Sequence, residues 1–326
     1  MKAFNFINSK MRKLFLLFLL FVYSLVGWSQ NGPFFGHYAF NESFFNPSAT
    51  ALSSQGAIVF QHRSQWLGYS SSFDGTGGAP ATQMITAVAP IRNFFLSSTG
   101  LILTNDKVGP LSSIQLSIPL TYSHVITSGA IHLGIAPGFF SLSQNFNELR
   151  PNEPDPLLQG GREVQTQPNL AAGITYTSNN HWHIGVGAIN ILEPTFSFGK
   201  SIENIQPITL SLNSGYEWFL SENIRINPSL LIRSNGKGLT FDLGSILTLN
   251  DKIWTGLSYR KSESIILFLG YSLLQEDKLK IGYSFDYVVQ NRNAKSLTSH
   301  ELFVKYDLPN FVIGGKKGVK TPRFSF

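Results

Sequence analysis

The chain has 326 residues and no cysteine, which excludes a disulfide, a lipoprotein anchor and a metal site with cysteine ligands. Charged residues are also scarce: they make up 13% of the chain, against roughly 25% in an average soluble protein. A surface with so few charges would be sticky in water. Past residue 30 the chain lacks an uninterrupted apolar run near the roughly 20 residues that a membrane helix needs. A helical membrane protein is therefore excluded.

The first 29 residues have the pattern of a secretory signal peptide. A start with four cations is followed by the apolar stretch LFLLFLLFVYSLV (residues 14–26), and Gly27 and Ser29 are small residues at positions −3 and −1 of a cleavage site. We therefore expect Sec-type export and removal of residues 1–29. The true start could be Met11, because the shorter leader would also suffice. A buried core helix is the alternative interpretation.

The net charge of +6 comes from the two ends of the chain. Without the four cations of the leader, 21 Lys and Arg face 19 Asp and Glu; without four more after residue 309, 17 face 19. No basic face remains for a nucleic acid, so we expect no nucleic-acid partner.

After an irregular segment at residues 30–54, the chain is a succession of segments in which apolar and polar residues alternate. In KLKIGYSFDY (residues 278–287), for example, one face carries Leu, Ile, Tyr and Phe and the other carries Lys, Gly, Ser and Asp. Period-two alternation predicts strands with one apolar and one polar face. Fourteen such strands are expected, at residues 55–66, 80–92, 96–106, 111–126, 129–143, 167–177, 181–191, 208–220, 223–233, 237–249, 252–261, 264–274, 278–288 and 297–308.

The links between these strands differ systematically in length. Links after even-numbered strands hold two or three residues, whereas links after odd-numbered strands include four long ones. An even strand number, short turns at one end and long loops at the other are typical of transmembrane barrels of bacterial outer membranes. A sheet inside hydrocarbon must also close on itself to pair every backbone group. The long links are residues 68–79, 144–166, 192–207 and 289–296.

We therefore predict an all-β fold: a single transmembrane antiparallel β-barrel of about 14 strands over residues 55–308. A soluble sandwich or propeller is the alternative. The last predicted strand, SHELFVKYDL (residues 299–308), would close the barrel. Its Leu302, Val304, Tyr306 and Leu308 would face lipid, and its Glu301, Phe303, Lys305 and Asp307 would face the lumen.

The alternation directs an unusual set of charged residues into the lumen. They are compatible either with a lumen filled by ion pairs or with a selective channel. The set comprises Arg63, Arg225, Arg233, Arg260, Glu217, Asp242, Asp286, Glu301 and Lys305.

Motifs for catalysis or cofactor binding are missing: the chain has no G-x-S-x-G, H-E-x-x-H, P-loop or complete G-x-G-x-x-G. His181 and His183 share one strand face and could hold a metal, but a polar pair at a strand start is the better interpretation. The stretch NDKVG (residues 105–109) has too few carboxylates for a cation loop and is read as a turn. We expect no metal and no cofactor.

Two further features point away from catalysis. Ser123 and His124 are adjacent and so point to opposite faces of a strand, which is the wrong arrangement for a Ser–His pair. Gly185 and Gly187 lie in the middle of a strand, where we expect them only to relieve packing. We expect no catalytic residues and a protein that is not an enzyme.

Several phrases, spread in order over nearly the whole mature chain, resemble the PorP/SprF outer-membrane proteins of the type IX secretion and gliding system of Bacteroidetes. The matching stretches are FNPSATA (45–51), RSQWLGY (63–69), GGAPATQ (77–83), PIRNFFLSSTGLILTNDKVGP (90–110), GYSFDYVV (282–289), SHELFVKYDL (299–308) and KTPRFSF (320–326).

The resemblance implies a barrel similar to the fatty-acid transporters (FadL-like) that anchors parts of a secretion machinery in the outer membrane. The implied partners are type IX secretion components, an exported surface adhesin or other cargo protein, a periplasmic peptidoglycan-associated lipoprotein and outer-membrane lipid. The family contains both core secretion components and members dedicated to one adhesin.

Two terminal segments complete the expected organisation. Residues 30–54 would start on the periplasmic side, where residues 34–47 either plug the barrel mouth or form a disordered lead. Residues 309–326 would form a basic periplasmic tail that either docks a periplasmic partner or lies near anionic lipid. The candidate partner-binding residues of this tail are Lys316, Lys317, Lys320, Arg323, Phe324 and Phe326.

Two functions remain open from the sequence. An anchor or scaffold for protein export should have a filled lumen and binding surfaces at both ends. A passive transporter or porin for small hydrophobic molecules should have a continuous path through the lumen.

Overall fold

The computed structural model of the chain describes residues 32–69, 78–91, 95–148, 161–198, 203–274, 278–290, 292, 295–308 and 313. The signal peptide predicted at residues 1–29 lies outside the described residues. No helix in the described part of the chain combines the length and the apolar character that crossing a membrane requires.

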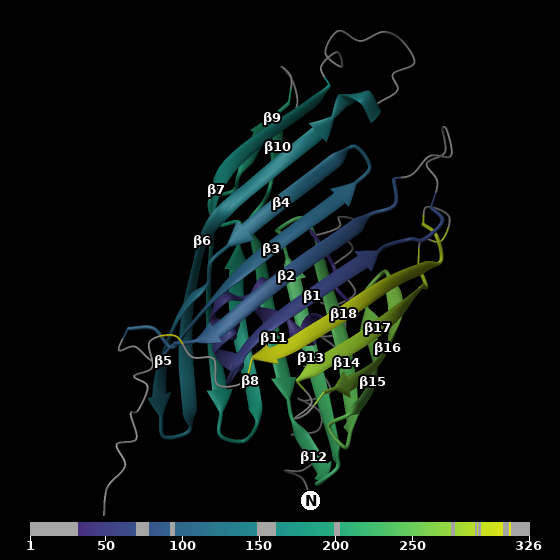
Figure 1. Cartoon of the computed structure of the whole chain (residues 1–326). Coiled ribbons are helices and arrows are strands. Elements are labelled where there is room, and N and C mark those ends of the chain that lie inside the picture. The colour runs from purple at the N-terminus through teal and green to yellow at the C-terminus, as the bar shows by residue number, and fades with distance from the viewer. Residues whose placement is uncertain are drawn as a thin grey trace, which may run out of the picture.

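Antiparallel strands make up most of the described chain (Figure 1). Their alternating sequences place apolar side chains on one face and polar side chains on the other. The strands are β1 (Gly56–Ser64), β2 (Ala81–Pro90), β3 (Ser98–Val108), β4 (Leu111–Ser117), β5 (Leu120–Ile126), β6 (Gly129–Asn145), β7 (Arg162–Ser178), β8 (Trp182–Ile189), β9 (Thr195–Ser197), β10 (Glu203–Ile205), β11 (Thr209–Tyr216), β12 (Trp218–Ser221), β13 (Ile224–Ser234), β14 (Leu239–Leu249), β15 (Ile253–Arg260), β16 (Ser264–Leu273), β17 (Leu279–Val288) and β18 (Thr298–Leu308).

Sixteen of these strands form one sheet that closes on itself. β1 pairs with the last strand, β18, while β11 bridges β8 and β13. β4 and β5 both pair with β3 and β6, and β12 continues β11 along β13, so each of these two pairs forms one strand of the barrel. The prediction of a closed antiparallel barrel of about 14 strands is therefore confirmed. Pro119, which cannot donate to the ladder, marks the break between β4 and β5.

The two faces of the strands sort as the sequence predicts. In β16 the burial alternates residue by residue, with Ile266 and Phe268 buried and Leu267 and Leu269 exposed. In β18, Glu301, Phe303 and Asp307 are buried inside the barrel, whereas the outward Leu302 and Tyr306 are exposed. The outer face of these two strands is thus largely apolar, and the buried charges of β18 point inward.

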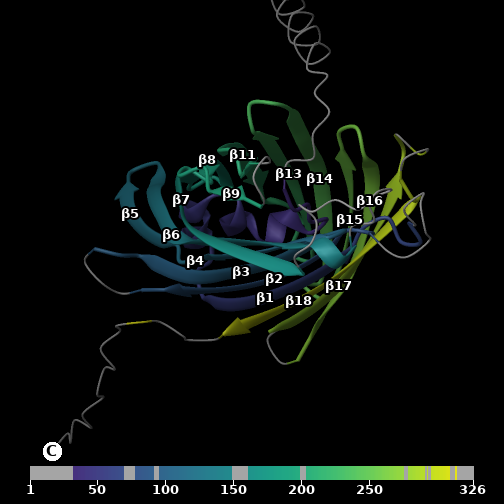
Figure 2. The same ribbon diagram turned by 90° about the horizontal axis from the view of Figure 1, so that it is seen from above.

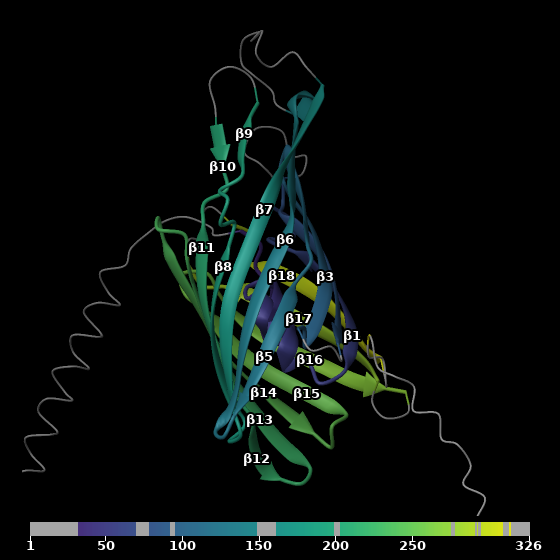
Figure 3. The same ribbon diagram turned by 90° about the vertical axis from the view of Figure 1, so that its left-hand side faces the viewer.

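One side of the barrel rises above the rest at the end where the long loops lie (Figure 3). β6 and β7 pair along their full length, from Gly129 with Ser178 to Asn145 with Arg162, which is longer than the sequence predicts. The link at residues 192–207, expected to be a plain loop, contains the hairpin β9–β10. Both differences lie at the long-loop end, where the sequence has no clear apolar–polar alternation to mark the bounds of a strand.

A non-strand segment precedes β1 and lies inside the ring of strands (Figure 2, purple). It contains three short 3-10 helices, η1 (Tyr38–Phe40), η2 (Glu42–Phe44) and η3 (Pro47–Leu52). A fourth, η4 (Phe146–Glu148), follows β6. We call residues 33–53 the lumen segment.

Candidate functional site

The lumen segment runs through the barrel interior from the long-loop end to the short-turn end. At the long-loop end, Arg233 near the end of β13 donates to the Pro33 carbonyl at 3.1 Å. At the short-turn end, the Thr50 hydroxyl lies 2.7 Å from that of Thr121 on β5. The chain then enters β1.

This path differs from the expected start on the periplasmic side, which would place the first residues of the segment at the short-turn end, where β1 begins. The first described residues, Gly32 and Pro33, line a cavity with Asn235 and Lys237, which follow β13 at the long-loop end. The position of β1 fixes only where the segment leaves the lumen. Its entry is set by long-range contacts that a local sequence pattern does not reveal.

Six buried ionisable side chains form a network in the long-loop half of the barrel, which we call the ion belt. Asp286 lies 2.7 Å from Arg63, and Asp242 lies 2.5 Å from Arg260 and 3.7 Å from Arg233. Three cations thus meet three carboxylates, and in a low dielectric each buried charge needs an opposite charge nearby. All six belong to the charged set predicted to face inward. The ion belt comprises Arg63, Arg233, Arg260, Asp242, Asp286 and Glu301.

Glu301 on β18 connects the ion belt to the lumen segment. Its carboxylate accepts hydrogen bonds from the Gly36 N–H at 2.6 Å and the His37 N–H at 3.1 Å, and lies 2.6 Å from His37 Nδ1. The His37 ring also stacks on Phe303 at a centroid distance of 4.9 Å. Charge-assisted hydrogen bonds are the strongest that a side chain makes, so this carboxylate is a principal attachment point of the segment.

The arginines of the ion belt also contact phenylalanine rings of the lumen segment. The Arg233 guanidinium lies 4.2 Å from the ring centre of Phe34 and 5.0 Å from that of Phe45, and Arg260 lies 4.8 Å from Phe34. Cation–π contacts gain strength when they are desolvated, as they are here.

A row of glycines on the opposite wall receives the middle of the lumen segment. Gly134, Gly173 and Gly187 are in register on β6, β7 and β8. A Cβ at Gly173 would lie 2.0 Å from Asn46 Oδ1, and one at Gly134 would lie 2.3 Å from the Ser48 nitrogen. Only glycine permits this approach. The role expected for Gly187, to relieve packing within its strand, therefore understates it: Gly187 makes room for the segment.

Asn46 is held in this row by hydrogen bonds on both ends of its amide. Its Nδ2 donates to Thr175 Oγ1 and Asn213 Oδ1, both at 3.0 Å, and its Oδ1 accepts from the Ser48 hydroxyl at 2.6 Å. The side chain is fully buried.

We expect Asn46→Ala to lower the free energy of unfolding by about 1 to 3 kcal/mol, because its buried partners are left unsatisfied. Urea unfolding of the detergent-solubilised barrel, followed by tryptophan fluorescence, measures this loss. Asn223→Ala, in an exposed turn, is the control and should change stability by less than about 0.5 kcal/mol. Equal effects of the two substitutions would contradict the assigned role of Asn46.

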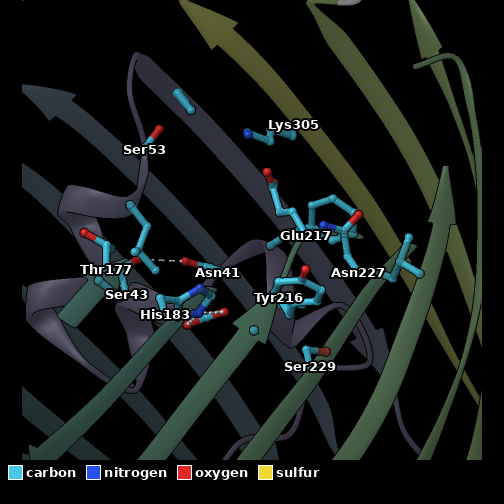
Figure 4. Close-up of a pocket in the computed structure, with 18 of the residues that line it drawn as sticks. Asn41, Ser43, Ser53, Thr177, His183, Tyr216, Glu217, Asn227, Ser229 and Lys305 are labelled. Carbon is cyan, nitrogen blue, oxygen red and sulfur yellow. Dashed lines mark hydrogen bonds and ion pairs between the residues drawn. The ribbon is translucent and has the colours of Figure 1, made fainter. Parts of the chain in front are cut away.

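The lumen segment separates two cavities. The inner cavity, of about 500 Å³, lies toward the short-turn end and is lined by polar residues that include Asn41, His183, Tyr216, Glu217 and Lys305 (Figure 4). The outer cavity, of about 270 Å³, lies at the long-loop end.

The boundary between the cavities lies within a single turn of the segment. Glu42 and Ser43 line the inner cavity, whereas the next two residues, Phe44 and Phe45, line the outer one. Among the described residues, no lining residue is shared between the two cavities. The lumen segment thus lies between these two cavities, with Glu42 and Ser43 on one side and Phe44 and Phe45 on the other.

The remaining charges predicted to face inward line the inner cavity. Arg225, Glu217 and Lys305 all contribute to its wall. Lys305 and Lys280 face each other across β18 and β17, and both contact Asp307, at 3.0 and 3.4 Å.

The histidines considered as metal ligands also lie at the inner cavity. His183 Nε2 lies 3.0 Å from a Glu42 carboxylate oxygen of the lumen segment, while His181 packs its ring edge against Phe219. In the described part of the chain, no group of three or more His, Cys, Asp or Glu residues is placed to hold a metal ion.

Ser123 does meet a histidine, though not its neighbour in sequence. Its hydroxyl lies 2.7 Å from Nδ1 of His132 on the next strand, and His132 Nε2 lies 2.9 Å from the Thr177 hydroxyl. The third member is a hydroxyl and not the carboxylate that orients a catalytic histidine. Pairing across β5 and β6 was not visible in the sequence, because it depends on strand register.

The basic tail residues Lys316, Lys317, Lys320, Arg323, Phe324 and Phe326 lie outside the described residues. One earlier tail residue is described: the Ile313 N–H donates to the Pro90 carbonyl at 3.0 Å, and Ile313 pairs with Ile91 at the end of β2. The tail therefore passes along the short-turn rim by position 313.

Comparison with solved structures agrees with the barrel fold. The toluene transporter TbuX of Ralstonia pickettii is 11% identical, with a TM-score of 0.51 over 88% of this chain and all of the other. A FadL homologue of Pseudomonas aeruginosa is 14% identical, with a TM-score of 0.47 over 86% of this chain and 96% of the other. At these identities the likeness to TbuX shows the fold alone. No curated protein matches the chain.

A family model covers nearly the whole chain. It is described as type IX secretion system membrane protein PorP/SprF and matches residues 28–306. The match includes the lumen segment, the ion belt and all the strands of the barrel except the end of β18. The resemblance noted in the sequence is thereby confirmed, and the chain belongs to the PorP/SprF family of type IX secretion system membrane proteins, as an outer-membrane β-barrel.

Proposed function

We propose that the protein is an anchor of the type IX secretion or gliding machinery in the outer membrane. It holds an exported surface protein at the long-loop end, outside the cell, and contacts periplasmic components at the short-turn end. The observation that supports this role is the filled lumen: the lumen segment is attached to the ion belt and the glycine row, and it lies between the two cavities.

A passive transporter for small hydrophobic molecules is the second candidate, favoured by the fold that the chain shares with the toluene transporter TbuX. The two roles differ in what they require of the lumen. A transporter needs a path that opens, whereas an anchor works with a lumen that stays closed.

The purified mature protein, inserted into planar bilayers, is expected to show no steady conductance. A porin of known conductance, inserted by the same procedure, serves as the positive control. Steady open-channel conductance, together with uptake of toluene into liposomes, would support the transporter and contradict the anchor.

Crosslinking in intact outer membranes, followed by purification of the barrel, tests the anchor directly. Secretion components and an exported surface protein should co-purify. Recovery of the barrel with lipid alone would contradict the proposal.

We further propose that the basic tail docks a periplasmic partner, such as a peptidoglycan-associated lipoprotein. Truncation after Ile313 removes the tail cations and keeps the contact with β2, so barrel stability should be unchanged. Loss of the periplasmic partner from the crosslinked material is the expected result. Unchanged recovery of that partner would contradict the docking role of the tail and leave the anchor proposal standing.

A further inference from the structure

The upper part of β7 has a strand neighbour on one side only. β6 pairs with all of β7, but the pairing with β8 begins at Ala172, which faces Ala188. Among the described residues, therefore, residues 162–171 of β7 have no strand on their second edge. This edge lies at the long-loop end, on the side of the barrel that rises above the rest (Figure 3).

The direction of the backbone along this edge follows from two hydrogen bonds. The Leu170 carbonyl accepts from the Ile191 N–H at 2.9 Å, away from β6, whereas the Gly161 carbonyl accepts from the Phe146 N–H at 2.8 Å, on the β6 side. Because backbone groups alternate along an antiparallel strand, even-numbered residues face the open edge. Val164 and Thr166 therefore direct their N–H and C=O groups outward from the sheet.

The hairpin β9–β10 contacts this part of β7 but does not pair with it as a strand. Its Phe196 packs against the inward Phe140, at a centroid distance of 5.7 Å. Its Ser197 is held by the side chain of Gln165, which donates to the Ser197 carbonyl at 2.6 Å and accepts from its N–H at 3.1 Å. The hairpin thus covers the inward face of β7, and Val164 remains 57% exposed.

Two exposed acidic residues lie beside the open edge. Glu163 is on β7 itself, and Glu203 on β10 pairs with Ser197, whose backbone is bonded to the Gln165 side chain. Arg162 is the basic residue of this edge, and its Nε donates to Ser143 at 2.6 Å. The local field therefore favours a ligand with positive charge.

We propose that the open edge of β7 binds an extended strand with basic side chains, supplied by the exported surface protein. The strand adds to the sheet through main-chain hydrogen bonds, and Glu163 and Glu203 select for its charge. Strand edges in soluble proteins are commonly blunted by charge or proline. Here Pro168 removes one donor and limits the docking stretch to residues 162–166. This inference rests on the proposed anchor function.

Thr166→Pro gives the sharpest test, because it removes an edge-facing N–H that β6 does not use. Proline is tolerated at sheet edges, so the barrel should stay folded. Thr166→Val is the matched control: both substitutions lose the 3.0 Å hydrogen bond from the Thr166 hydroxyl to Ser141, but valine keeps the backbone donor. A gel-mobility shift on heating verifies folding of all variants.

The probe is a fluorescein-labelled hexapeptide of alternating lysine and valine, titrated against the mature protein in nanodiscs and followed by fluorescence anisotropy. Saturable binding is expected for the wild type and Thr166→Val, with about tenfold weaker binding for Thr166→Pro. A peptide with glutamate in place of lysine should bind more weakly than the lysine peptide. Equal binding to the proline and valine variants would overturn the edge site, and equal binding of the two peptides would overturn its preference for basic strands.

The outcome can be separated from that of the anchor proposal. Crosslinked purification from cells carrying Thr166→Pro should lose the exported protein and retain the periplasmic components. If the peptide binds as expected but secretion components never co-purify with the wild type, the anchor function fails and the strand-binding edge stands.

Discussion

Asp242→Ala is expected to lower the free energy of unfolding by about 3 to 5 kcal/mol, the cost of removing one partner from a buried ion network. Asp242 lies 2.5 Å from Arg260 and 3.7 Å from Arg233, and all three side chains are at most 3% exposed. Without this carboxylate, two guanidinium groups remain inside the barrel, and the counter-charges left to Arg260 are the buried Glu263 and Asp286, the latter at 3.9 Å. The loss is measured by urea unfolding of the detergent-solubilised protein.

A control substitution at an exposed carboxylate separates the effect of burial from the effect of losing a charge. Asp251 lies 3.3 Å from Arg225, but its side chain is 66% exposed. Exposed ion pairs contribute about 0 to 1 kcal/mol, so Asp251→Asn, which removes the charge and tolerates the φ of 55° at this position, should have a small effect. If the two substitutions cost the same, the ion belt is not a structural element of the barrel.

The strands could be predicted from the sequence because their signal is local. In β16 buried and exposed residues alternate along the whole strand, and in β18 most polar residues alternate with apolar ones, so a barrel with lipid outside and a largely polar lumen satisfies both faces. The same alternation predicts that Arg63, Asp242 and Glu301 face inward, as they do in the structure.

The contacts of the lumen could not be predicted, because they join residues far apart in the chain. His37 and Glu301 are 264 residues apart, and their contact depends on the closure of the barrel and on the path of the lumen segment. Register is equally hidden: Ser123 meets His132 only because β5 and β6 pair as Ser123 with His132. A sequence without aligned relatives carries no signal for either contact.

The glycine row, by contrast, has a local signal in the sequence that indicates close packing. Glycine is depleted in strand interiors, so its presence in the middle of β6, β7 and β8 indicates a close approach by another backbone. Gly134, Gly173 and Gly187 each fall within a strongly alternating strand. Read together, they predict a segment packed against that wall, although not which segment.

Gly173→Val is expected to displace the lumen segment and to turn a silent barrel into a conducting one. A Cβ at this position would lie 2.0 Å from Asn46 Oδ1 and 2.9 Å from Asn46 Cγ. Asn46 cannot yield at low cost because its amide is fixed by Thr175, Asn213 and Ser48. Overpacking of this kind typically costs about 1 to 3 kcal/mol. Here we expect the cost to weaken the contact between the lumen segment and strands β6, β7 and β8.

Planar-bilayer recordings measure the result, with the wild type expected to show no steady conductance and Gly173→Val expected to show a stable open level. Ala172→Val is the control, because the neighbouring side chain points to the outer face of the same strand and adds the valine there. The strand pairing of the barrel should be preserved in both variants, because lipid and not the lumen segment covers the outer face of the strands. A Gly173→Val barrel that stays closed and unfolds at the same urea concentration as the wild type would show that the glycine row does not hold the segment.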